Sequence, residues 1–383
     1  MPAPIRPHPM KTLAIAVVLL SLTMSPGARA ARALGELELA EPAEGAGGVT
    51  EKAGFTVERL GDGVFAAIRT DPPGLMVDAN CLFIVNDDDV VVVDAPEASA
   101  DLIAALRRIT TKPVSYLINT HWHDDHVIGN AAWRQAYPGI RFIAHASLRA
   151  YLPTTGLANR RQMIEGAPQF AAQMQAQMDK GRNLNDEPIS EEERASYASD
   201  IRLVRHYMDV VPGTATVLPD LDVNEGLTLV RGQRRIEIRH LGSGHTLADL
   251  VVWLPRERIV ATGDLVVWPV PLVGAEQSHV HDWPATLDAL LRLDPAIFVP
   301  GHGPVLRSAD YPRKVRDLFA SINTQVAAAV ARGATLEETR KGVDLTRFRD
   351  SFAGDSKVRR FAFGMYVAGP AVEASWREAK QTP

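Results

Sequence analysis

The sequence predicts an α/β protein in which two β-sheets pack face to face and helices cover their outer sides. Three observations lead to this class. The chain of 383 residues is 46 % hydrophobic and 23 % charged, an ordinary globular composition with enough apolar residues for a large core. Strand-like runs gather in two halves, residues 55–144 and 215–299, and both halves contain helical runs. Because a sheet must bury one of its faces, two such halves favour a layered sandwich.

The first half alternates short β-type runs with turns and amphipathic helical segments. Turn residues such as Gly61-Asp62-Gly63 bound the apolar runs, as in hairpins. We expect strands at residues 55–60, 64–68, 81–85, 90–93, 114–118 and 140–144, and helices at residues 101–109 and 128–137. Cys81, the only cysteine, lies in one of these runs, so no internal disulfide can form and a buried core thiol is expected.

The second half repeats this mixture of strands and helices. We expect strands at residues 227–230, 235–239, 250–254, 259–261 and 297–299, and helices at residues 283–293 and 311–331. Residues 53–310 are therefore predicted to form the main domain, and residues 311–383 a C-terminal helical extension.

The segment between the halves, residues 147–211, is rich in Gln, Met, Arg and Glu and has helical character. We expect a helical insertion that forms a lid over the substrate pocket, because the segment is much longer than a normal connection between strands. Met163, Met174 and Met178 would give this lid an adaptable apolar face. The alternative is ordinary core or a dimer contact far from the site.

The first thirty residues have the features of a secretory signal. Arg6 and Lys11 form a basic start that precedes an apolar run at residues 13–22, and small residues up to Ala30 provide an A-x-A cleavage site. A retained membrane anchor is the alternative, but it needs about 18 to 20 apolar residues, roughly twice this run. We therefore expect cleavage after Ala30, a periplasmic or secreted protein without membrane contact, and a flexible linker over residues 31–52.

The charge of the chain bears on its partners. Removing residues 1–30 would take away three basic residues and no acid, so the formal net charge would move from −5 to −8. An acidic protein is a poor ligand for polyanions. We therefore expect a small-molecule substrate and no nucleic acid, and an oligomer is compatible with the sequence.

The most informative stretch is Thr120-His121-Trp122-His123-Asp124-Asp125-His126, directly after a predicted strand. Three imidazoles and two carboxylates so close together are hard to explain by packing, because buried polar rings need partners and gain nothing from a neighbouring cation. A divalent metal resolves this. On a loop, His121 and His123 can point one way while Asp125 and His126 turn toward a second position, so the motif can supply two adjacent ions.

Three further candidate ligands follow strands at turn positions, each beside glycine. They are His245 in Gly242-Ser243-Gly244-His245-Thr246, Asp264 in Thr262-Gly263-Asp264, and His302 in Pro300-Gly301-His302-Gly303. Glycine lets the backbone turn sharply and approach a metal without a Cβ clash.

In this order, H-x-H-x-D-H, G-x-x-H-T, T-G-D and P-G-H-G resemble the metallo-β-lactamase superfamily, and the resemblance covers about residues 55–305. It implies an αβ/βα four-layer sandwich with the metal site at one edge. It also implies a ligand set: His121, His123 and His245 for a first metal, Asp125, His126 and His302 for a second, and Asp264 as the bridging carboxylate.

The resemblance further implies a zinc hydrolase with two Zn²⁺ ions per chain. Two dications about 3.5 to 4 Å apart lower the pKa of a bridging water, and the resulting hydroxide attacks a carbonyl or phosphoryl group. Asp125 is the expected catalytic residue, because it would bind the second metal and orient the hydroxide. Asp94 matches an early acidic position of the superfamily that supports the ligand loop.

The bridging Asp264 indicates which part of the superfamily the chain is similar to. The main antibiotic-hydrolysing subclasses carry Cys or Ser there and often a nearby cation, whereas residues 265–280 contain no Lys or Arg. A bridging Asp is typical of glyoxalase-type thioesterases and lactonases. We expect cleavage of an ester, lactone, thioester or amide, although export argues against a glutathione thioester. A periplasmic metallo-β-lactamase is the alternative hydrolase.

Two other classes of function compete with hydrolysis. Some superfamily members are iron proteins with redox activity, but the flavin-linked type usually has Glu at the position of His123. A metal-binding accessory protein without turnover usually has a degraded ligand set, and here the set is complete. The remaining histidines, His145, His206, His240, His279 and His281, are expected in packing, surface or supporting positions, with the last two the best candidates to line the pocket.

Overall fold

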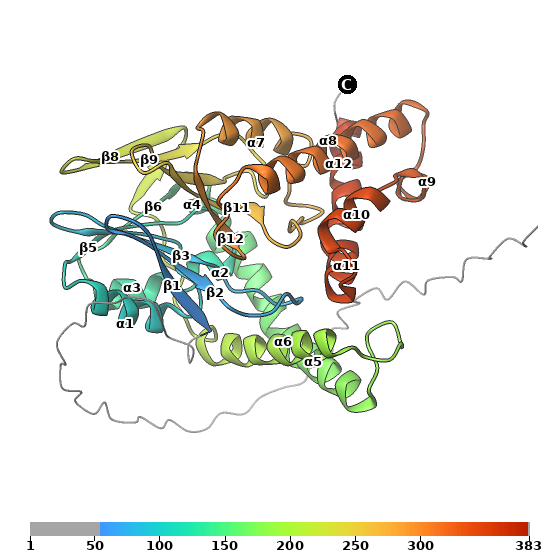
Figure 1. The fold of residues 1–383 in the computed structure, drawn as a ribbon, viewed down its shortest axis with the longest axis horizontal. Helices are drawn as coiled ribbons and strands as arrows, with labels where there is room; N and C mark the ends of the chain where they lie inside the picture. Colours follow the sequence, from blue (N-terminus) through green and yellow to red (C-terminus); the bar gives the residue numbers. More distant parts are fainter. Residues whose placement is uncertain (1–53, 382–383) are drawn as a thin grey trace, which may run out of the picture. The chain divides into compact units, whose positions relative to one another are not determined.

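Two β-sheets form the centre of residues 54–381, which are the residues that the computed structural model describes (Figure 1). The predicted signal sequence and linker lie outside these residues. The first sheet consists, in spatial order, of β1 (Phe55–Gly61), β2 (Val64–Arg69), β3 (Cys81–Val85), β4 (Val90–Val93), β5 (Val114–Ile118), β6 (Arg141–His145) and β7 (Leu221–Val223). The second consists of β12 (Ile297–His302), β11 (Ile259–Val267), β10 (Leu250–Leu254), β9 (Arg234–His240) and β8 (Gly226–Arg231).

The directions of the strands bring several connecting segments to the same edge of the two sheets. Strands β1 to β4 pair antiparallel, whereas β4 to β7 pair parallel. In the second sheet β11 and β12 are parallel, and β10 is antiparallel to both β9 and β11, so β9, β11 and β12 run the same way. Parallel strands end at the same edge of their sheet. Segments that follow β4, β5, β9 and β12 can therefore meet there.

The alternation of side chains along the strands explains the layers. Val91 and Val93 of β4 face the core between the sheets, while Val90 and Val92 face the outer helices. All four valines are buried, because both faces of the sheet are covered. Cys81 of β3 lies in the outer core and is 2 % exposed, which confirms the expected buried thiol.

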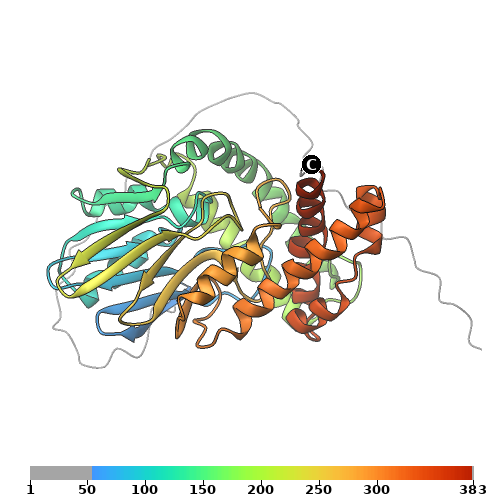
Figure 2. The same cartoon turned by 90° about the horizontal axis from the view of Figure 1, so that it is seen from above.

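Helices cover both outer faces. On the first sheet, α1 (Ser99–Ile109) and α3 (Asn130–Ala136) pack through residues that include Leu106 and Trp133. On the second sheet, α7 (Trp283–Arg292) and α8 (Asp310–Ala331) pack through residues that include Leu287 and Phe319. Figures 1 and 2 show these helices on opposite sides of the paired sheets. The predicted four-layer αβ/βα sandwich is confirmed.

The segment between β6 and β7 is helical. It comprises α4 (Leu148–Tyr151), a π-helical turn η2 (Leu152–Gly156), α5 (Leu157–Lys180) and α6 (Glu191–Val210). A capping box between Ser190 and Glu193 starts α6. Met174 and Met178 pack with Tyr197 of α6 in a core of their own, so the expected apolar face of three methionines toward the pocket is wrong for these two.

The chain after β12 adds further helices to the outer side of the second sheet. After α8 come α9 (Leu336–Gly342), α10 (Thr346–Ala353), α11 (Lys357–Phe363), a π-helical turn η3 (Gly364–Ala368) and α12 (Gly369–Gln381). Phe352 and Phe363 belong to the same apolar cluster as the residues of α7 and α8. Among the described helices, none combines the length and the apolar character that crossing a bilayer requires.

Candidate metal centre

The ligand loop leaves the end of β5 and is held by Asp94 at the end of β4. The Asp94 carboxylate accepts hydrogen bonds from the backbone N–H of Thr120 (2.8 Å), from the Thr120 hydroxyl (2.8 Å) and from Nδ1 of His126 (2.9 Å). Asp94 itself has φ of 62°, a conformation that L-residues rarely adopt. A carboxylate that is held so tightly in a strained conformation fixes the start and the end of the loop, which agrees with the supporting role expected for Asp94.

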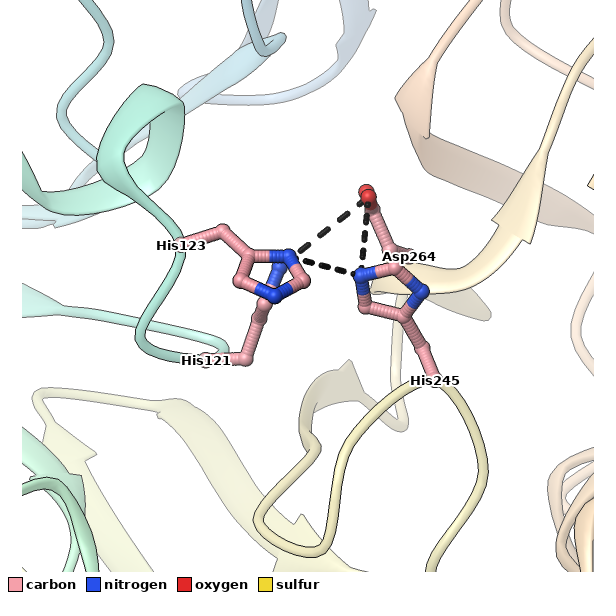
Figure 3. Close-up of side chains that lie close together, drawn as sticks. All are labelled: His121, His123, His245 and Asp264. Atoms are coloured by element: carbon pink, nitrogen blue, oxygen red, sulfur yellow. Dashed lines mark hydrogen bonds and ion pairs between the residues drawn. The ribbon is translucent and has the colours of Figure 1, made fainter. Parts of the chain in front are cut away.

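The structure brings all seven candidate ligands together, in two groups. His121 and His123 from the loop meet His245, from the β9–β10 connection, and Asp264 of β11 (Figure 3). Asp125 and His126, both in the short helix α2 (Asp124–Val127), meet His302 at the end of β12. Within each group, the ligand atoms lie within 4.8 Å of one another. The division matches the assignment that the resemblance implied, and metal binding itself stays a prediction.

Asp264 lies between the two groups, with one carboxylate oxygen toward each. Its Oδ1 is 3.3 Å from Nε2 of His126 and 3.4 Å from Nε2 of His302. Its Oδ2 is 3.4 Å from Nε2 of His245 and 4.0 Å from Nε2 of His121. Gly301 allows this approach, because a Cβ at that position would lie 1.9 Å from Oδ1 of Asp264.

Each of the five histidines uses its outer ring nitrogen for a hydrogen bond away from the centre. The contacts are His121 Nδ1 to Thr120 Oγ1 (3.2 Å), His123 Nε2 to Gln277 Oε1 (3.1 Å), His126 Nδ1 to Asp94 Oδ2 (2.9 Å), His245 Nδ1 to the Leu272 carbonyl (2.9 Å) and His302 Nδ1 to the Asp78 carbonyl (3.2 Å). Because these partners are oxygen acceptors, the outer nitrogen donates its proton, and a ring that is neutral, or that a metal deprotonates, then directs a lone pair inward.

The inward-facing atoms therefore lack donors. The Nε2 atoms of His121, His126 and His302 and Oδ1 of Asp264 are buried without a hydrogen-bond partner. Nδ1 of His123 and Nε2 of His245 lie 2.9 Å apart with a lone pair on each. Buried acceptors without donors cost free energy, and lone pairs that face each other repel. A divalent cation removes both costs, so the residues present fit a pair of metal ions.

The two groups differ in how tightly they hold protons. Burial lowers the pKa of His121, and it lowers that of His245 to about 4, so these rings are neutral at pH 7. Burial also lowers the pKa of His302, but the carboxylates of Asp264 and Asp125 outweigh it and raise the pKa to about 10. A metal ion that binds the second group must therefore displace protons from its imidazole rings. The first group can bind a metal ion without that step.

A buried ion pair joins the ligand loop to the helical insertion. Nε and Nη2 of Arg160, on α5, donate to the carboxylate of Asp124 at 2.7 to 3.1 Å. The Tyr207 hydroxyl, on α6, donates to the same carboxylate at 3.1 Å. Asp124 separates the ligands His123 and Asp125 in the chain. Sequence reasoning did not assign a role to Arg160 or Tyr207, because nothing in their local sequence marks a partner so distant in the chain.

Other residues around the centre also escaped the sequence analysis. Gln277, Asp78 and Leu272 orient ligand rings, two of them through backbone carbonyls, which no side-chain motif can reveal. Within the described chain, the two ligand groups include none of the remaining histidines. His281 is exposed, and the rings of His145 and His240 pack against each other at 4.9 Å.

A cavity of about 320 Å³ opens beside the centre. His123, Asp125, His245 and Asp264 reach its wall, so a molecule in the cavity can contact the ligand groups directly. The predicted pocket residues His279 and His281 are not part of this wall.

Comparisons with known proteins agree with this geometry. A sequence profile described as the metallo-beta-lactamase superfamily matches residues 76–302, more than half of the chain. The linear primary-alkylsulfatase of a Pseudomonas species is 22 % identical over 275 residues, which are 67 % of this chain and 48 % of that protein. The metallo-beta-lactamase type 2 of Bacillus cereus is 32 % identical over 88 residues, 22 % of this chain and 34 % of that enzyme. The chain thus spans about half or less of the length of these relatives.

A metallo-beta-lactamase from Pontibacter korlensis superimposes with a TM-score of 0.48 and 16 % identity. The superposition covers 70 % of this chain and 99 % of that one.

Proposed function

The chain belongs to the metallo-β-lactamase superfamily of metallo-hydrolases, and on that premise we propose that it is an exported enzyme with two zinc ions. Its proposed reaction is the cleavage of an ester, lactone, thioester or amide of small size. The observation that carries the proposal is the position of Asp264, whose two oxygens face the two ligand groups separately. A carboxylate placed in this way is suited to bridging two ions.

The donor set supports zinc as the metal. Imidazole nitrogen and carboxylate oxygen are common zinc ligands, and zinc accepts the small coordination numbers that three or four protein ligands allow. When bound, the two ions supply Lewis acidity and lower the pKa of a coordinated water enough for it to attack at neutral pH.

The side chains of this protein have distinct parts in the reaction. Asp125 Oδ2 lies 3.1 Å from Nε2 of His302, and Asp125 also borders the cavity, so its carboxylate can accept a hydrogen bond from the attacking water and orient it. The thiol of Cys81 is no substitute nucleophile, because burial raises its pKa well above the ordinary value and the outer core encloses it.

Export belongs to the same proposal. Residues 1–30 have the pattern of a cleavable signal, and a chain with one cysteine needs no disulfide in an oxidising compartment. The proposed location is the periplasm or the exterior, with small molecules as partners rather than nucleic acid.

A periplasmic metallo-β-lactamase remains the second candidate. The observation that favours it is the match to the metallo-beta-lactamase type 2 of Bacillus cereus, with 32 % identity over 88 residues. The bridging Asp264 and the absence of Lys and Arg from residues 265–280 favour the broader ester and lactone class instead.

The test is a substrate panel with the full chain after zinc loading. The panel contains a phenyl ester, a lactone, a thioester, an anilide, a cephalosporin and a linear alkyl sulfate. We expect hydrolysis of the ester or lactone that disappears on chelation and returns with zinc. Absence of zinc-dependent turnover across the panel contradicts the hydrolase proposal, and a cephalosporin rate above all others favours the second candidate.

A further inference from the structure

We propose that the cavity beside the metal centre selects substrates that carry an uncharged, apolar group beyond the bond that is cleaved. The reaction in this inference rests on the proposed function, whereas the selectivity rests on the cavity itself. The cavity is expected to favour neutral esters and lactones over substrates with a remote carboxylate, such as β-lactams and glutathione thioesters.

The walls of the cavity are largely apolar, and their apolar residues come from distant parts of the chain. Segment 75–77 lies between β2 and β3, Trp122 belongs to the ligand loop, Met163 to α5 and Tyr366 to the π-helical turn η3. Leu272 and Val273, after β11, complete this apolar lining. An alkyl or aryl group placed here leaves water for apolar contacts.

The charged groups in the wall are almost all acidic. Glu97, Asp124, Asp125 and Asp264 contribute carboxyl groups, and Arg160 is the one basic side chain among the described lining residues. The guanidinium of Arg160 is 7 % exposed and is paired with Asp124 through Nε and Nη2. Its Nη1 is directed at the Thr214 carbonyl (3.3 Å). The charge of Arg160 is therefore already balanced.

An anionic group in this cavity would lose its hydration without gaining a counterion. Metal ions at the centre would attract an anion only at the reacting bond itself, and their charge is partly balanced by Asp125 and Asp264. A carboxylate several carbons away would instead meet apolar side chains, the Asp124–Arg160 pair, whose charges already balance, and the carboxyl group of Glu97, whose pKa burial raises well above its usual range. Desolvation without a counterion disfavours that position.

The apolar wall is held in place before any ligand binds. The carboxylate of Asp200, on α6, accepts hydrogen bonds from the backbone N–H groups of Leu75 (3.0 Å) and Met76 (2.9 Å). The Tyr366 hydroxyl donates to the carbonyl of Leu75 at 2.5 Å. Gly74 permits the first contact, because a Cβ there would lie 2.2 Å from Oδ1 of Asp200. This wall is therefore preorganised, and a ligand that binds there loses little free energy to ordering it.

A matched pair of esters tests the selectivity. Phenyl heptanoate and monophenyl pimelate share the reacting bond and the chain length, and differ only in a terminal methyl or carboxylate. We expect kcat/KM to be at least about tenfold higher for the neutral ester. Equal values, or a preference for the anionic ester, overturn the inference.

Met163 offers a variant that should change this ratio in a defined direction. It lines the cavity and is 41 % exposed, so a longer polar side chain can reach both the cavity and water. Met163→Lys places an unpaired cation at the wall and should reduce the neutral-to-anionic ratio severalfold, whereas Met163→Leu should keep the ratio. An unchanged ratio in Met163→Lys contradicts the electrostatic argument.

A binding measurement separates this inference from the proposed reaction. Octan-2-one and 7-oxooctanoate are ketones that lack a hydrolysable bond and again differ in a terminal methyl or carboxylate. In calorimetric titrations of the full chain, octan-2-one should bind at least about tenfold more tightly. If octan-2-one binds in this way and no ester is cleaved, the proposed reaction fails and the selectivity stands. If octan-2-one does not bind, or binds no better than its anionic partner, the selectivity is overturned.

Discussion

Five histidines surround Asp264, and contacts outside the centre set the orientation of their imidazole rings. Each imidazole is tied at its outer nitrogen to an oxygen acceptor, and these acceptors come from Thr120, Gln277, Asp94 and the carbonyls of Leu272 and Asp78. Such contacts fix the tautomer and the ring plane before a metal binds. In the first group the inward lone pairs face one another, and in the second group a metal exposes them by displacing protons, which is the physical reason that the centre suits cations.

The clearest prediction at the scale of one residue concerns Asp125. Replacing it by alanine removes a carboxylate oxygen that lies 3.1 Å from Nε2 of His302, together with the group that would orient water. We expect Asp125→Ala to lose at least about a hundredfold in kcat and to bind one zinc ion less, with the fold intact. Steady-state kinetics, metal analysis and circular dichroism check this.

His281→Ala is the matched control for Asp125→Ala. His281 is exposed and lies outside the cavity wall and both ligand groups, although the sequence had suggested it for the pocket. Its loss should change kcat/KM by less than about tenfold. Similar losses in the two variants would show that the boundary of the site is misplaced.

At the scale of elements, the insertion helices contact both the ligand loop and the cavity wall. Arg160 of α5 and Tyr207 of α6 bind Asp124, and Asp200 of α6 holds Leu75 and Met76. Of the three methionines that were expected to face the pocket, Met163 alone lies in the cavity wall. Met174 and Met178 pack between α5 and α6 instead. These polar contacts position the insertion beside the metal centre together with apolar packing, of Leu148 and Leu152 against Trp122 and of Tyr207 against Ile128.

Removing Arg160 should weaken the ligand loop. Arg160→Ala leaves the carboxylate of Asp124 largely buried and without its cation, which costs about 3 to 5 kcal/mol for a broken buried pair. We also expect zinc affinity to fall roughly ten- to hundredfold, as for other groups that support metal ligands. Chelator competition measures the affinity, and urea unfolding measures the stability.

Two further variants show whether the loss of stability and zinc affinity in Arg160→Ala is caused by breaking the ion pair with Asp124. Arg161→Ala removes an exposed arginine from the same helix and should leave both quantities nearly unchanged. The double variant Arg160→Ala with Asp124→Asn removes the unpaired charge and should recover part of the lost stability. Equal losses in Arg160→Ala and Arg161→Ala would mean that the ion pair does not support the loop.

At the scale of the whole molecule, the fold was the most predictable property. Uninterrupted apolar runs such as residues 81–85 and 90–93 mark strands buried on both faces, and these strands lie where the sequence placed them. Strand β7 was missed because it has three residues, too few for a periodic signal. The helix expected at residues 128–137 begins later, at Asn130, because Asp124–Val127 forms a separate short helix.

The ligands were predictable because they are concentrated in short motifs, whereas the cavity was not. Its walls combine the ligand loop, the insertion and η3, whose π-helical turn has no sequence period that marks it. Tyr366 reaches Leu75 across nearly three hundred residues, as a result of how the C-terminal helices pack on the second sheet. Contacts of this kind depend on the assembled fold.

The central claim is that one chain holds two metal ions with Asp264 between them, and the most direct test is to count them. The full chain is stripped with chelator, dialysed against excess zinc and then against buffer, and its zinc is measured by mass spectrometry relative to protein concentration. The account predicts two zinc ions per chain, since seven ligands exceed what one tetrahedral ion accepts. It predicts about one in Asp264→Ala, because that variant loses the carboxylate that faces both ligand groups. One ion per chain in the unaltered protein, or two in Asp264→Ala, would contradict it.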